Sequence, residues 1–103
     1  MSNFKLIYKI LSAFEAAMDA PMFDLEQLSA TRLNVSEERR ARYFEMLADC
    51  GYIKGVTVYA DVTGDTAIEA ENPRITLKGL EYLAENGIMQ QLYKAAKSVK
   101  DLV

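Results

Sequence analysis

The chain has 103 residues, half of them apolar, and its fifteen acidic and twelve basic side chains give a net charge of −3. This length supports one packed domain, which we expect to span residues 1–103, and it is too short for two ordinary hydrophobic cores. There is no histidine and a single cysteine, Cys50, which removes the commonest metal ligand and general base and excludes an internal disulfide.

We expect a cytoplasmic protein with no metal, no cofactor and no membrane contact. No apolar run approaches the length of a membrane span, and the first residues do not form a signal peptide. The lone cysteine suits a reducing compartment. The acidic balance repels phosphate at long range, although a local basic patch can still bind it.

The first predicted element is a helix from about Asn3 to Asp19, which Pro21 closes. Its apolar face is unusually wide, because two adjacent rows of apolar side chains follow the helical period. The rows are Phe4, Ile7, Leu11, Phe14 and Met18, and beside them Leu6, Ile10, Ala13 and Ala17. Such a helix is covered on two sides. We favour a position for this helix at the centre of the monomer, and a place in a dimer interface is the alternative.

A short helical segment is predicted next. Met22-Phe23 can add a very short strand before it, and Asp24 is a good N-cap for a helix over Leu25 to Ala30. A turn from Thr31 to Val35 follows, in which Asn34 is the residue best suited to a left-handed conformation.

The third predicted helix covers residues 36–50. Ser36 caps it, and Gly51 suits the left-handed position just after a helix end. The expected buried stripe is Ala41, Phe44, Leu47 and Ala48, with Tyr43 and Met46 beside it.

A β-hairpin is predicted after this helix. Residues from Tyr52 to Ala60 are rich in β-branched and aromatic types, Gly64-Asp65 marks a turn, and Thr66 to Glu71 returns. Pro73 fits the start of a last strand segment or the edge of a sheet.

Two helices are expected to complete the chain. Thr76 caps the first, from Leu77 to Asn86, and Asn86-Gly87 ends it. Its inward residues are expected to be Leu77, Leu80, Leu83 and Ala84. Gly79 lowers its helix propensity, which close backbone packing can offset.

The second of these helices, from Ile88 towards Leu102, is amphipathic and has the first helix as its natural partner. The order of elements predicts an α+β fold, a winged helix-turn-helix with a β-hairpin wing and an extra C-terminal helix packing on the first helix.

Three stretches of the chain resemble the YjcQ family, small proteins of bacteria and of their phages or prophages. They are GYIKGV at residues 51–56, ITLKGLEYLAENG at 75–87 and LYKAAKSVKDLV at 92–103. The resemblance implies a winged-helix fold and a phage or prophage connection, for example with a structural or head-associated protein. It implies no established activity and no catalytic residues.

DNA binding is one functional hypothesis, in which the helix over residues 36–50 enters the major groove and the hairpin reaches a neighbouring groove or the backbone. The candidate contacts are Arg32, Arg39, Arg40 and Arg42. Glu38, Glu45 and Asp49 share the exposed half of that helix, however, and along the hairpin Asp61, Asp65, Glu69 and Glu71 oppose only Arg74. We therefore favour the interpretation that the arginines pair with nearby acids.

A protein-interaction module is the hypothesis that we favour modestly over DNA binding. Phe4, Ile7 and Tyr59 are the candidate interface residues, and the partner is another copy of the chain, a phage assembly component or a regulatory complex. Catalysis is not expected, since there is no phosphate-cradling glycine loop, no metal-ligand cluster and no nucleophile–histidine pair.

Overall fold

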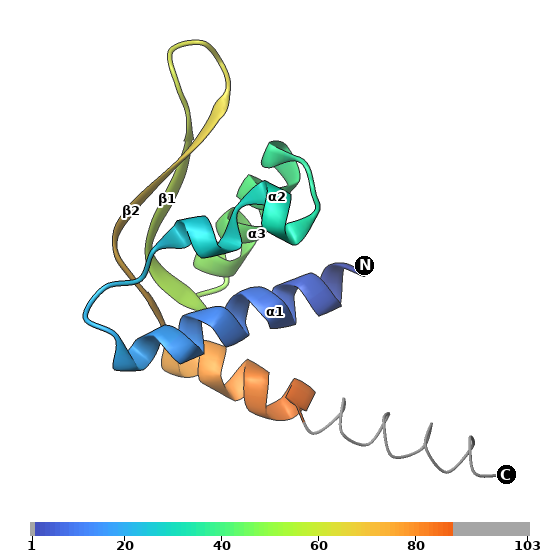
Figure 1. The fold of residues 1–103 in the computed structure, drawn as a ribbon, viewed down its shortest axis with the longest axis vertical. Coiled ribbons are helices and arrows are strands. Elements are labelled where there is room, and N and C mark those ends of the chain that lie inside the picture. The colour runs from blue at the N-terminus through green and yellow to red at the C-terminus, as the bar shows by residue number, and fades with distance from the viewer. Residues whose placement is uncertain (1, 88–103) are drawn as a thin grey trace, which may run out of the picture.

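The computed structural model describes residues 2–87, and its element order confirms an α+β winged-helix arrangement (Figure 1). The elements are α1 (Asn3–Ala16), η1 (Ala17–Asp19), η2 (Leu25–Leu28), α2 (Ala30–Leu33), α3 (Glu37–Asp49), β1 (Ile53–Ala60) and β2 (Thr66–Ile75), followed by a helix that includes residues 77–87. The predicted C-terminal helix and its packing on the first helix lie outside the described residues.

Helix α1 forms one wall of the core. The side chain of Ser2 caps it by accepting a hydrogen bond from the backbone N–H of Lys5. Its buried residues are Leu6, Ile10, Leu11 and Phe14, and the Phe14 ring packs against Phe23 and Phe44 at centroid distances of 4.7 and 6.3 Å. The wide apolar face is therefore divided, because Phe4 and Met18 from the same rows are exposed.

The segment after α1 differs from the prediction. Asp24 caps only the short 3-10 turn η2, and Met22 and Phe23 are not in a strand. Residues 31–33, which were expected in the turn, lie in α2 instead, because Ser29 is a second cap whose hydroxyl accepts from the N–H of Arg32. Asn34 ends α2 with φ 57° and ψ 48°, the left-handed conformation predicted for it.

Helix α3 begins and ends as the sequence predicts. The Ser36 hydroxyl accepts from the N–H of Arg39 at 3.1 Å, and Gly51 has φ +79°. The N–H groups of Gly51 and Tyr52 donate to the carbonyls of Ala48 and Leu47, which together form a Schellman motif. This tight exit turns the chain directly into β1.

Strands β1 and β2 pair antiparallel and form the wing, with Val56 opposite Ala70 and Ile53 opposite Ile75. Strand β2 is longer than predicted, because pairing resumes after an irregularity at Gly55. Gly55 has φ +81°, and a Cβ there would lie 2.6 Å from the carbonyl oxygen of Glu71, so glycine is required at this position.

The helix at residues 77–87 packs beneath α1 in Figure 1 and begins at its predicted cap. The Thr76 hydroxyl accepts from the N–H of Gly79, and an added Cβ at Gly79 would collide with the carbonyl oxygen of Tyr52. The predicted close packing is therefore confirmed. The inward assignments of Leu77 and Ala84 were wrong, since both are exposed. Residues 86 and 87 are helical, and where this helix ends lies outside the described residues.

Candidate functional site

A groove lies where the first turn of α1 meets the exposed side of α3. We call it the α1–α3 groove, and its volume is about 580 Å³. It is lined by Asn3, Phe4, Ile7, Ser36, Glu38, Arg39, Arg42, Tyr43 and Met46. The groove brings together two of the predicted interface residues and two of the predicted DNA contacts, which the sequence assigned to competing hypotheses.

The apolar part of the groove is open to solvent. The side chain of Phe4 is 73% exposed and that of Met46 is 47% exposed, while Ile7 is half-buried between them and the core. Phe4 is exposed because it is the second residue of α1, before the helix reaches the buried row that starts at Leu6. Asn3, Tyr43 and Met46 line this site, and sequence reasoning did not assign them to one. For Met46, its place beside the buried stripe of α3 was a usable signal.

Two arginines border this apolar surface. Arg39 donates from Nη1 to Oδ1 of Asn3 at 3.0 Å, and the hydroxyl of Tyr43 donates to the same oxygen at 2.5 Å, so Asn3 joins α1 to α3. Arg42 forms an exposed ion pair with Glu45 at 3.3 Å, which confirms acid pairing for this arginine. Each guanidinium uses one nitrogen in these bonds and keeps further N–H donors for a partner.

Arg40 faces away from the groove. Its Nε donates to the carbonyl oxygen of Leu28 at 2.6 Å and its Nη2 to that of Leu25 at 3.2 Å, while the guanidinium lies 5.1 Å from the centre of the Phe44 ring. The side chain therefore holds η2 onto α3. Arg32, the remaining candidate, is exposed on α2 and does not line the groove.

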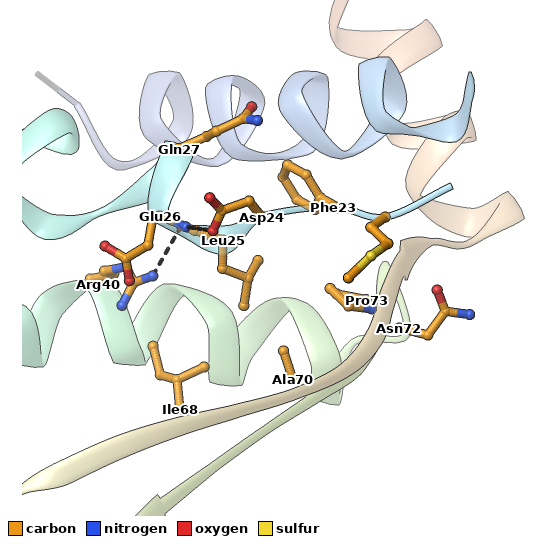
Figure 2. A pocket seen from close by; sticks show the side chains of 11 residues that line it. Phe23, Asp24, Leu25, Glu26, Gln27, Arg40, Ile68, Ala70, Asn72 and Pro73 are labelled. Carbon is orange, nitrogen blue, oxygen red and sulfur yellow. Dashed lines mark hydrogen bonds between the residues drawn. The ribbon is translucent and has the colours of Figure 1, made fainter. Parts of the chain in front are cut away.

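Arg40 also borders a second hollow, of about 830 Å³, between residues 22–27 and β2 (Figure 2). Figure 2 shows Phe23 and Leu25 on one side and Ile68 and Ala70 on the other. The Arg40 guanidinium at this hollow already donates its hydrogen bonds to backbone carbonyls of the same chain. We therefore do not place the binding site there.

The loop of the wing is acidic, because it contains Asp61 and Asp65 and no basic residue. Residues 61–65 form the loop, which we call the wing tip, and Glu69 adds a carboxylate on the returning strand. Oδ1 of Asp61 accepts from the N–H and hydroxyl of Thr63 and from the N–H of Asp65, and the Thr63 hydroxyl lowers the pKa of this carboxyl group below its usual value. These bonds fix the loop.

Two apolar side chains stand out on this acidic wing. Tyr59, the third predicted interface residue, is 47% exposed near the end of β1, and Val62 in the tip is fully exposed. The wing's single arginine, Arg74, lies at its base and donates to backbone carbonyls of η1 and the residues after it. The wing tip is therefore an acidic surface with an apolar centre.

Comparisons with known proteins give one match. A family model described as YjcQ protein matches residues 8–102. Neither the curated proteins nor the solved structures that were searched gave a match. Across residues 2–87, no helix is long and apolar enough to cross a membrane, and no cluster of three or more histidine, cysteine or acidic side chains could hold a metal ion.

Proposed function

The chain belongs to the YjcQ family, and from this premise we propose that it is a non-enzymatic winged-helix module of the phage or prophage type that binds a protein partner through the α1–α3 groove. Its role is in assembly or regulation. The observation that carries this proposal is the exposure of Phe4 and Met46 in a groove bordered by Arg39 and Arg42.

The groove has the composition of a protein interface. Aromatic side chains, methionine and arginine are enriched at such interfaces, and Phe4, Met46, Arg39 and Arg42 meet here. Exposed apolar side chains that gather in a hollow favour a partner that covers them. A partner with an apolar side chain next to carboxylates would bury the first against Phe4 and pair the second with the arginines.

The second candidate is DNA binding through α3. It is favoured by the exposure of Arg39 and Arg42 near the start of that helix, where a winged-helix protein contacts bases. The wing argues against it, because its loop would bring Asp61 and Asp65 towards phosphate, and salt does not screen charges in direct contact. We therefore rank protein binding first.

Site-specific photo-crosslinking tests the proposal. A photoreactive amino acid replaces Met46 in the full chain. The crosslinking is carried out in cells of the kind that naturally produce this protein. We expect a discrete protein adduct that Phe4→Glu abolishes. Leu77→Glu is the matched control, because Leu77 is 73% exposed like Phe4 but lies on another helix. Loss of the adduct in both variants would contradict a groove-specific contact.

Fluorescence anisotropy with random-sequence duplex DNA separates the two candidates. Binding that falls steeply with salt and disappears in the Arg39→Ala, Arg42→Ala double variant would establish DNA as the ligand of α3. That result, together with no protein adduct from position 46, would overturn the proposal.

A further inference from the structure

We propose that the partner of the α1–α3 groove is the wing tip of a second copy of this chain, so that copies associate head to tail. This inference rests on the proposed function, since it names the occupant of the same groove. The occupant is identified by the match between two surfaces that the fold places apart.

The wing tip has the form of a ligand. Val62 is fully exposed and makes no use of its apolar surface within its own chain. It lies between Asp61 and Asp65 in the loop sequence, and the bonds that the Asp61 carboxylate accepts from Thr63 and from the N–H of Asp65 hold the loop in one conformation. A preordered loop loses little conformational entropy when it binds.

The groove presents the complementary arrangement. Its exposed apolar side chains, Phe4 and Met46, lie beside the guanidinium groups of Arg39 and Arg42. The carboxylates of Asp61 and Asp65 both lie next to the Thr63 hydroxyl, close to Val62 in the loop. Val62 can therefore bury its methyl groups in the groove while these carboxylates accept hydrogen bonds from arginine. Glu38 also lines the groove and Glu45 pairs with Arg42 beside it, so what the groove offers a carboxylate is the set of N–H donors that the two guanidinium groups keep free.

The contact has to form between two copies. In Figure 1 the loop end of the hairpin projects away from α1 and α3, so a chain cannot place its own wing tip in its own groove. Each copy then offers one tip and one groove. Such a head-to-tail contact gives a closed ring or an open filament, whereas a symmetric dimer through α1 would leave the wing unused.

The contact area is small, so the association is expected to be weak. One loop in one groove falls below the roughly 1,200 Å² that stable interfaces bury. We expect the mean mass in solution to rise with protein concentration and to fall with added salt, because the pairing charges are exposed.

Mixing two blocked variants tests the direction of the contact. Phe4→Glu blocks the groove, and Val62→Asp blocks the tip without disturbing a buried side chain. Each variant alone should be monomeric by sedimentation velocity, yet an equimolar mixture should form a heterodimer, because one intact groove and one intact tip remain. Leu77→Glu should associate as the wild type does, and circular dichroism confirms that every variant is folded.

Three results would overturn the inference. The first is a wild-type chain that stays monomeric at about 1 mM, a concentration at which even a complex with a Kd of about 1 mM is partly formed. The second is a dimer that Phe4→Glu abolishes and Val62→Asp does not. The third is a mixture of the two variants that remains monomeric. With any of these, crosslinks from position 46 to a different protein would still support the proposed function, so the two failures are distinguishable.

Discussion

Replacing Arg74 with methionine should destabilise this protein far more than replacing any exposed arginine. The Arg74 guanidinium donates from Nη1 to the carbonyl oxygen of Ala17 at 2.7 Å, and from Nη2 to those of Ala20 and Pro21 at 3.0 and 2.9 Å. The carbonyl of Ala17, at the start of η1, also accepts from the N–H of Ala20, while those of Ala20 and Pro21 follow the end of η1, where helical hydrogen bonding stops. One side chain thus fastens the end of the first helical segment to the base of the wing.

The magnitude follows from burial. A hydrogen bond to a charged group contributes about 1.5–3 kcal/mol when it is protected from water. The bonds to Ala17 and Ala20 are partly buried and the bond to Pro21 is exposed, so water replaces part of the loss. We expect Arg74→Met to lower the free energy of unfolding by about 2–4 kcal/mol, a large part of the total of about 5–10 kcal/mol expected for such a domain.

Urea denaturation followed by far-ultraviolet circular dichroism measures this difference. Arg42→Met is the matched control, since its ion pair with Glu45 is exposed and should contribute less than about 1 kcal/mol. Arg74→Lys should fall between the two, because it keeps the charge and loses the planar fork. Equal unfolding midpoints for Arg74→Met and Arg42→Met would refute the reasoning.

Two further predictions concern a glycine and a carboxylate. Gly79→Ala should lower the free energy of unfolding by about 1–3 kcal/mol. The new Cβ would collide with the carbonyl oxygen of Tyr52 and lie 2.7 Å from Cγ1 of Ile75. A melting temperature higher than that of the wild type would contradict this close packing. The pKa of Asp61 is lowered in the folded chain by the Thr63 hydroxyl, so its support of the wing tip is present above the unfolded value of 3.8 and is lost as the pH falls through the folded value. Amide exchange at Thr63, corrected for its intrinsic rate and measured by NMR, should show this loss of protection on acidification, and the same profile in Asp61→Asn would exclude Asp61 as its cause.

The sequence by itself determined where most elements begin and end. Ser36 caps α3, Asn34 and Gly51 adopt left-handed conformations, and Thr76 caps the next helix, all as predicted. Each of these features is made by hydrogen bonds or backbone angles within a few consecutive residues, so the information is local. Even the missed start of α2 had a local signal, because Ser29 is as good a cap as Asp24.

The candidate site was only partly accessible from the sequence. Phe4 and Ile7 were identified from the width of an apolar face, and Arg39 and Arg42 from their place on a helix. Nothing in the local pattern showed that these four side chains would line one groove. That result depends on how α1 crosses α3, which is fixed by the packing of the core.

Only the tertiary structure decided which charges and apolar side chains are used inside the fold. The sequence treats Arg40 and Arg42 alike, yet Arg40 is bonded to carbonyls twelve and fifteen residues away, while Arg42 pairs on the surface. Arg74 reaches carbonyls more than fifty residues away. The exposure of Leu77 was also decided by the tertiary structure. Helical spacing shows which face of the helix a residue is on, but it does not show whether another element covers that face. A helix cap is formed by residues that are close in the sequence. The carbonyl acceptors of Arg40 and Arg74 are distant in the sequence, so only the folded backbone brings them within hydrogen-bond distance of the guanidinium groups.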